Sequence, residues 1–328
     1  MTRFLVLLFA VVFASAQALA QDRSRWPQYL TLGTASIGGT FAVYGNGVAT
    51  VIRDGAGIPV QAQNTQGPSQ NLVLVQTGQI DIGMTTLGPA WEAWSGELEI
   101  NKGVRHRDIR ALFPMYEAPF QIIALQKSGI SSLHDLDSKT VGIGPATATG
   151  ATYFPRWFSE FGIRVSTRTG QYMDLAGDLI SGRLDAVTFA GGIPNPSIVE
   201  VEAMQPINIF SFSDDERAKL LASNPFLSPL TVPAGIYHSL TAPQTTVAMW
   251  SFVIANKAMP NSLAYAIVKA VLEKQRDLMA VHASAKETTA ANIVNDRFLW
   301  LHPGAIRYYR EAGIAIPAQL IPPVNSGD

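Results

Sequence analysis

The stretch TGQIDIGMTT at residues 77–86 has a near repeat, SGRLDAVTFA, at residues 181–190. Each stretch begins with a small residue and a glycine, has an aspartate three positions after that glycine, and continues as an apolar run. An amphipathic helical pattern precedes both stretches, with its apolar positions at Leu72 and Val75, then at Leu175 and Leu179. We expect the glycine to end each helix in a left-handed conformation and the apolar run to form the next strand.

A second pair of similar segments lies upstream of this repeat. YLTLG at residues 29–33 and TVGIG at residues 140–144 are short apolar runs that end in glycine and lead into a turn rich in Thr, Ser and Gly. A helical pattern follows each turn, with apolar positions at Phe41, Tyr44, Val48 and Val51, then at Tyr153, Trp157 and Phe161, closed by Gly162. The two patterns together predict an α/β protein made of two βαβ units of similar build.

The ends of the predicted strands mark a candidate ligand site. Parallel strands joined by helices place their loops at the carboxyl ends, where open α/β sheets bind ligands. In one half this brings together residues 33–40 and 84–89, with 64–71 beside them, and in the other half residues 144–150 and 189–194. Facing each other, the two sets would line a cleft between two lobes.

The C-terminal region has helical patterns without strands between them. Asn261 or Ser262 is expected to cap a long helix whose apolar face runs to Leu278, and residues 301–314 predict another helix, with Pro303 in its first turn. We expect these helices to pack on the first lobe, so that the chain crosses between lobes at 115–123 and near 240–250. The predicted division is a signal peptide at 1–20, lobe 1 at 26–119 plus 246–328, and lobe 2 at 120–245.

The N-terminus and the composition indicate an exported protein. Arg3, an apolar run and the Ala18-Leu19-Ala20 site are typical of a secretory signal peptide. The chain has no cysteine, which suits a periplasmic protein stabilised by its core better than a disulfide-rich secreted domain. Its formal charge of −1 gives no reason to expect a nucleic-acid or anionic-membrane partner.

Enzymatic chemistry is not expected. None of the five histidines falls in the candidate loops or has the spacing of a metal site, and His302 is expected to start a helix. Asp81 and Asp185 are expected to cap the helix–strand turns in which they lie. The glycine-rich turns lack the spacing of nucleotide-binding loops. The sequence therefore predicts no catalytic residue, no metal and no cofactor.

The candidate loops offer hydroxyl groups, backbone amides and aromatic faces. The hydroxyl donors are Thr34, Ser36, Thr40, Ser69, Thr85, Thr86, Thr147 and Thr149, and the aromatic faces are Phe41, Tyr44, Tyr153 and Phe189. Helices expected to begin at Gly38–Gly39, near Ser69 and near Gly150 would present free N–H groups, which bind a carboxylate without Arg or Lys. The alternative, tight turns with ordinary caps, stays open.

The absence of Arg and Lys from the candidate loops limits the class of ligand that we expect. Because a dianion is usually met by a bidentate Arg, loops without Arg or Lys favour one carboxylate or a neutral, partly apolar solute. Glu117, at the crossing, could meet a ligand amine or be a surface residue of a hinge strand, and Trp91 and Trp94 could line the cleft or pack the lobe.

Six motifs in order resemble those of one family of receptors. They are SIGGTF (36–41), GPSQNLVLVQTGQIDIGM (67–84), SGISSLHDLDSKTVGIG (128–144), SGRLDAVTF (181–189), VPAGIY (232–237) and LHPGAIRYYREAG (301–313). Across essentially the whole chain after residue 20, the sequence resembles the TAXI family of solute receptors, which serve tripartite ATP-independent periplasmic (TRAP) transporters.

The resemblance implies a two-lobed, type II-like periplasmic binding protein that closes on a small organic acid or amino acid. The resemblance also implies that the cargo passes to the membrane permease subunits of an ion-driven TRAP transporter, and a monomer is expected. By position, the resemblance implies ligand contacts at Ser36, Gly38, Gly39, Thr40, Ser69 and Asn71 in the first lobe, and at Thr147, Thr149, Gly150, Gly191 and Gly192 in the second. The hydroxyl and aromatic residues Phe41, Thr86 and Phe189, named above, complete the predicted site.

Two departures from the family pattern alter the expected pocket. Phe41-Ala42-Val43 stands where the family has Tyr-Tyr-Pro, and residues 147–150 read TATG where it favours Gly-Ser-Gly-Thr. A more apolar pocket is expected, so glutamate, which known members bind, is not carried over. A periplasmic sensor module with the same cleft remains the alternative function.

Overall fold

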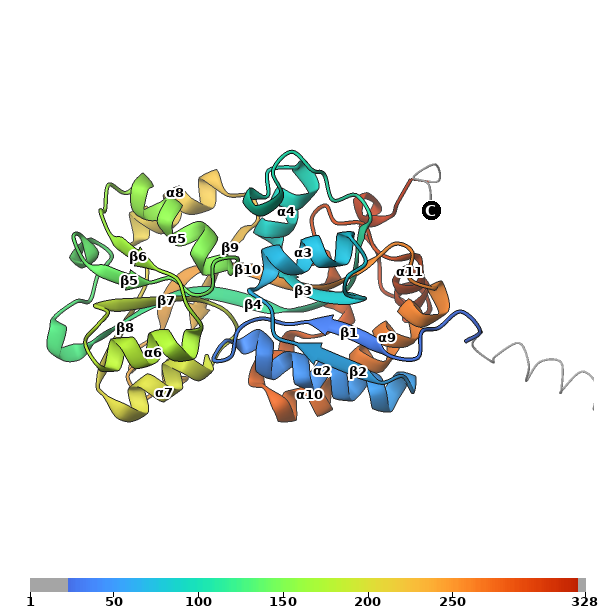
Figure 1. The fold of residues 1–328 in the computed structure, drawn as a ribbon, viewed down its shortest axis with the longest axis horizontal. Helices are drawn as coiled ribbons and strands as arrows, with labels where there is room; N and C mark the ends of the chain where they lie inside the picture. The colour runs from blue at the N-terminus through green and yellow to red at the C-terminus, as the bar shows by residue number, and fades with distance from the viewer. Residues whose placement is uncertain (1–22, 324–328) are drawn as a thin grey trace, which may run out of the picture.

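A computed structural model describes residues 23–323, and the predicted signal peptide lies outside the described residues. The chain forms two lobes that lie side by side and are joined by long strands (Figure 1). Strands in the described part follow the order β2-β1-β3-β10-β4-β7-β5-β6, with β8 beside β4 and β9 beside β10.

In the first lobe, the central strand is β1 (Leu30–Gly33). It pairs in parallel with β2 (Val60–Gln63) on one side and with β3 (Ile82–Thr86) on the other. All four β1 residues lie in the register with β2, and Leu30 and Leu32 are fully buried. The short apolar run of the sequence is therefore the centre of a parallel sheet.

The second lobe repeats this arrangement. Here β5 (Thr140–Gly142) is central and pairs in parallel with β6 (Ser166–Arg168) and β7 (Ala186–Ala190). The two βαβ units that the sequence repeat predicted are present, one in each lobe.

Two long strands connect the lobes. β10 (Gln244–Asn256) runs antiparallel to β3, β4 (Ile109–Leu125) runs antiparallel to β7, and the two also pair with each other. β8 (Ile207–Phe210) and β9 (Leu227–Val232) extend the sheet beside them. The crossings expected at 115–123 and near 240–250 fall in β4 and β10, and the boundaries at 119/120 and 245/246 stay predictions.

The repeated aspartates form hydrogen bonds between neighbouring parallel strands, near the N-terminal ends of these strands. The Asp81 Oδ2 atom accepts hydrogen bonds of 2.7 Å from the backbone N–H and the hydroxyl of Thr31 on β1. Asp185 Oδ2 accepts a bond of 2.8 Å from the backbone N–H of Thr140 on β5. The repeated aspartate thus has a structural role, because it fixes one parallel strand beside the next.

Helices cover the faces of the sheets (Figure 1). Their bounds are α2 Thr40–Ala56, α3 Pro68–Gln76, α4 Leu87–Ser95, α5 Thr149–Glu160, α6 Tyr172–Ile180, α7 Pro196–Met204, α8 Asp214–Ser223, α9 Asn261–Glu273, α10 Gln275–Val281 and α11 Pro303–Glu311. Glycines with φ of +70° and +76°, Gly78 and Gly182, follow α3 and α6, as the repeat predicted. A side chain there would be strained even though there is open space around both.

The C-terminal helices pack on the first lobe, with α9 against α2 and α11 against α9. Two details of the prediction are wrong. The N-cap of α9 is Pro260, because Asn261 is already helical and the Ser262 hydroxyl accepts a bond of 2.9 Å from the Trp26 indole. The helix also breaks at Lys274, so Leu278 is buried from the separate helix α10.

No helix in residues 23–323 is long and apolar enough to cross a membrane.

Candidate functional site

Five segments converge where the lobes meet. They follow β1, β2, β3, β5 and β7 and comprise residues 34–40, 64–71, 86–88, 144–150 and 190–197, called the cleft loops below. None of these residues is charged. The sequence predicted that loops of the two halves would face each other, and in this structure they are in hydrogen-bonding contact.

One set of contacts joins the loop after β1 to the loop after β7. The Thr40 hydroxyl, at the start of α2, donates a bond of 2.8 Å to the carbonyl of Gly192. The Ser197 hydroxyl donates one of 3.0 Å to the carbonyl of Gly38. Gly38 has a φ of +88°, and a Cβ there would lie 2.5 Å from the Ser197 oxygen, so both conformation and space require glycine.

A second set of contacts lies on the other side of the cleft. The Ser69 N–H, in the first turn of α3, donates a bond of 3.2 Å to the carbonyl of Thr147. The hydroxyls of Thr86 and Thr149 lie 2.8 Å apart, and both are buried. The lobes are therefore closed on each other, because groups at helix N-termini of one lobe are satisfied by the other.

Several buried polar atoms at this interface have no hydrogen-bond partner among the described residues. They are Ser36 Oγ, Tyr116 OH, Gln121 Nε2 and Thr147 Oγ1. Buried polar groups are nearly always paired, so such atoms are candidates for a ligand or an ordered water. Burial raises the pKa of Tyr116 well above its usual range, so its hydroxyl remains a donor.

Tyr116 and Gln121 are candidates that sequence reasoning missed. Both lie on β4 within the crossing segment, where only Glu117 was considered. The Tyr116 ring lies beside Gly192, since a Cβ on that glycine would be 2.8 Å from it. Gln121 accepts a bond of 3.1 Å from Tyr237 through Oε1, which leaves its amide nitrogen unpaired. The signal in the sequence was polar residues in an otherwise apolar crossing strand.

Aromatic rings line the same region. Tyr116 packs edge-on against Phe41 and Tyr44, with ring centroids 6.2 and 5.1 Å apart. Phe189 stacks on Tyr172 at 5.0 Å. Tyr172, also missed from the sequence, touches both lobes, because a Cβ on Gly39 would lie 3.3 Å from its ring and one on Gly144 2.6 Å from its hydroxyl.

Other predicted contacts have structural partners here. The Asn71 amide nitrogen donates to the carbonyls of Gly33, Thr34 and Met84 at 3.1, 2.7 and 2.8 Å, while its Oδ1 is unpartnered. Gly150 lies in the first turn of α5. The Gly191 N–H donates to the carbonyl of Pro119 at 3.4 Å. That the predicted residues contact a ligand remains a prediction.

In this structure Glu117, Trp91 and Trp94 contact other parts of the protein. Glu117 is half-buried, accepts a hydrogen bond from the Ser228 hydroxyl and lies beside Glu287, and burial is the main cause that raises its pKa. Trp94 packs on Trp300 with ring centroids 5.0 Å apart. Trp91 packs edge-on against Phe298 and is 40% exposed. None of these side chains belongs to the cleft loops.

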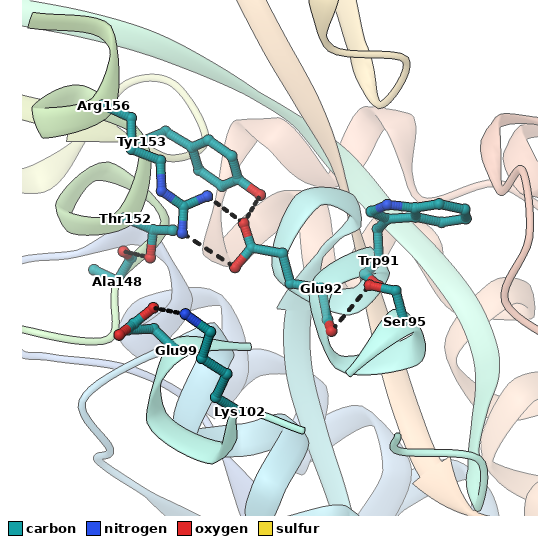
Figure 2. A network of polar contacts seen from close by, with 9 residues as sticks. All are labelled: Trp91, Glu92, Ser95, Glu99, Lys102, Ala148, Thr152, Tyr153 and Arg156. Atoms are coloured by element: carbon teal, nitrogen blue, oxygen red, sulfur yellow. Dashed lines mark hydrogen bonds and ion pairs between the residues drawn. The ribbon is translucent and has the colours of Figure 1, made fainter. Parts of the chain in front are cut away.

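A groove of about 320 Å³ opens beside the cleft loops, between α4 and α5. Ser69 and Thr147 line it together with Glu92 and Arg156. These last two, which the sequence did not single out, form a polar network with Tyr153 across the lobes (Figure 2). Within residues 23–323, no group of three or more His, Asp or Glu side chains could hold a metal ion.

A model of the NMT1-like family matches residues 32–313. The match covers both lobes and all cleft loops.

Solved structures with the same fold include several binding proteins. The periplasmic binding protein BugD has a TM-score of 0.55 at 13% identity, over 89% of this chain and 100% of its own. MatC from Rhodopseudomonas palustris with bound malate has 0.55 at 13%, over 80% and 92%. A substrate binding protein of an ABC uptake transporter from Streptococcus pneumoniae with bound histidine has 0.52 at 15%, over 80% and 97%. These likenesses confirm the predicted two-lobed α/β fold.

Proposed function

Because the chain belongs to the NMT1-like family and has the fold of two-lobed binding proteins, we propose that it is an extracytoplasmic solute receptor. It binds a small organic acid or amino acid between its lobes and delivers it to the permease subunits of a TRAP transporter. The TRAP assignment rests on the ordered motifs of the sequence, and the periplasmic location on the predicted signal peptide.

The observation that carries this proposal is the set of unpartnered polar atoms between the lobes. Ser36 Oγ, Tyr116 OH and Thr147 Oγ1 are buried without a hydrogen-bond partner among the described residues, and they come from both lobes. A solute that satisfies such atoms gains most when the lobes are shut. Ligand binding then favours closure, because only a difference in affinity between open and closed forms shifts their balance.

The chemistry of the site favours a ligand with at most one negative charge. The cleft loops carry no charged side chain, and the N-cap residues of helices α2 and α5, Gly39 and Ala148, provide no side-chain cap. Free N–H groups at such N-termini bind one carboxylate. The rings of Phe41, Tyr116 and Phe189 suit an apolar remainder of the ligand.

Thermal unfolding against a panel of small acids tests the proposal. The purified protein is stripped of solute by unfolding and refolding, then screened with amino acids, dicarboxylates, oxo-acids, and branched or aromatic monocarboxylates. A ligand at a thousand times its Kd adds roughly 4 kcal/mol to the free energy of unfolding, which shifts Tm by many degrees. We expect a monocarboxylate to give the largest shift.

A matched pair of variants locates the bound ligand. Ser36→Ala should reduce the shift, whereas Ser159→Ala, an exposed position on α5, should leave it unchanged. Equal shifts in both variants, or no shift with any solute, would contradict the proposed site. Solute uptake by membranes that contain the permease then separates transport from the sensor alternative, which predicts binding without uptake.

A further inference from the structure

Glu92 of the first lobe is held by two side chains of the second lobe. Its Oε1 atom accepts hydrogen bonds from the Tyr153 hydroxyl at 3.0 Å and from Arg156 Nη1 at 2.5 Å, and Arg156 Nη2 lies 3.5 Å from Oε2 (Figure 2). Glu92 lies on α4, and its two partners lie three residues apart on α5, so they share one helix face. We call these three residues the interlobe latch.

Burial within the latch is unequal. The Glu92 side chain is 7% exposed, whereas the Arg156 side chain is 48% exposed. Within the described residues, the Glu92 carboxylate accepts hydrogen bonds only from the opposite lobe. A buried carboxylate without its partners is strongly unfavourable, so the closed form depends on Arg156 and Tyr153, while an open form would let water replace them.

The ion pair of the latch differs from the others in residues 23–323. The remaining pairs join groups within one lobe, as Arg164–Asp137 does at 3.0 Å in the second lobe and Lys257–Asp108 at 3.4 Å in the first. Glu92–Arg156 is the one that closure must form and opening must break. Its free energy therefore enters the balance between the two forms directly.

The latch lies beside the cleft loops but is formed by residues outside them. Glu92 and Arg156 line the groove of about 320 Å³ on which Ser69 and Thr147 also lie. Tyr153 is buried against the first lobe, since a Cβ on Gly88 would be 2.3 Å from its hydroxyl. The latch thus lies next to Thr147, and its three side chains are paired with each other, unlike the unpartnered atoms that would hold the ligand.

We propose that Glu92, Tyr153 and Arg156 set the closing equilibrium of this receptor and so control its affinity for every ligand without contacting any of them. The inference rests on the proposed function, because it concerns the closing of a solute receptor. They are positioning residues. A change in the latch should scale the affinities of different ligands by the same factor, whereas a change in a ligand contact alters their ratios.

Three substitutions give graded expectations. Arg156→Gln leaves Glu92 without its cation and should lower the ratio of closed to open molecules roughly tenfold. This effect is smaller than that expected for a fully buried ion pair, because Arg156 is half exposed. Arg156→Lys keeps the charge and should recover most of that ratio. Tyr153→Phe removes one donor and should lower it by roughly three- to tenfold.

The chain has no cysteine, so closure can be measured with two introduced ones. Val104→Cys on the first lobe and Ser159→Cys on the second lie at exposed positions and accept a pair of fluorophores. Energy transfer between them is recorded in the ligand-free protein and its variants, at low and at high salt. We expect Arg156→Gln to be more open than the parent, and salt to open the parent more than the variant.

The control is Arg164→Gln, which removes an ion pair confined to one lobe and should leave the energy transfer unchanged. Equal transfer in Arg156→Gln and the parent, with both proteins folded, would overturn the latch. That result would leave the receptor proposal standing, since the proposal predicts a ligand-induced change in the same transfer. A latch effect without any ligand-induced change would instead contradict the receptor role.

Discussion

The hydroxyl groups of Thr86 and Thr149 lie 2.8 Å apart, although one ends the last parallel strand of the first lobe and the other begins a helix of the second. Both residues are at most 2% exposed, so each hydroxyl has the other as its buried partner. From the sequence, both residues are predicted to contact the ligand. In the closed form they bind each other.

Thr86→Val should weaken ligand affinity by about 1–3 kcal/mol, because it leaves the Thr149 hydroxyl buried without its partner in the closed form. The double variant Thr86→Val/Thr149→Val should lose less than the sum of the two single losses, since replacing both partners leaves neither unpaired. Calorimetric titration of all three variants with the best acid of the panel checks this. Additive losses would mean that each hydroxyl binds the ligand separately.

Gly192→Ala should act as a wedge between the lobes. A Cβ there would lie 2.5 Å from Ser284 Oγ, 2.8 Å from the Tyr116 ring and 3.0 Å from the Thr40 methyl group. Overpacking of this kind costs about 1–3 kcal/mol, and here the cost falls on closure, so affinity should drop while Tm of the ligand-free protein changes little.

The control for this wedge is Gly177→Ala in helix α6, where nothing lies within 4 Å of an added Cβ. It should keep the parental affinity and gain up to about 1 kcal/mol in stability. An unchanged affinity in Gly192→Ala would show that the lobes do not approach as closely in solution.

Much of the fold could be predicted because its signals are local. The repeated glycine and aspartate mark the turns at Gly78 and Gly182, and the aspartates dock β1 and β5. Apolar spacing located α2 and the face that it buries. The long strand β4 was harder to predict, because a strand buried on both faces shows no alternation of apolar and polar residues. Its apolar run indicated only that the chain crosses between the lobes there.

The candidate site was less predictable, because its contacts join distant parts of the chain. Glu92 and Arg156 are 64 residues apart and meet only when the lobes close. Tyr172 enters the cleft from the start of α6, and nothing in its neighbourhood distinguishes it from a core residue. Loop composition located the cleft, but which hydroxyls satisfy each other depends on the packing of two lobes.

Asn71→Asp separates a structural role from ligand binding. The Asn71 amide nitrogen donates to two carbonyls at the end of β1 and to one within β3 and is fully buried, so a carboxylate would face three acceptors. We expect a loss of about 3 kcal/mol in the free energy of unfolding by urea. Asn224→Asp, a half-buried control on the second lobe, should lose less than about 1 kcal/mol. Parental stability with a lost affinity would make Asn71 a ligand contact instead.

Asp296 should make the free energy of unfolding depend on pH. Its carboxyl group is fully buried and accepts hydrogen bonds from the backbone N–H groups of Phe298 and Leu299 at 3.2 and 3.0 Å. Burial raises its pKa to about 7, whereas an unfolded Asp titrates near 3.9. Between these values the folded state keeps a proton that the unfolded state releases. The stability contribution is therefore complete below about pH 4 and is lost as pH rises towards 7.

Asp296→Asn removes this titration and keeps an oxygen for the two backbone donors. Its stability relative to the parent should increase between about pH 4 and 7, with a slope of up to about 1.4 kcal/mol per pH unit, and then level off. Urea unfolding of both proteins at four pH values measures the difference. Glu117 and Glu287, whose pKa values burial also raises, titrate in both proteins and cancel. A difference that stays constant across this range would show that Asp296 is already ionised in the folded protein.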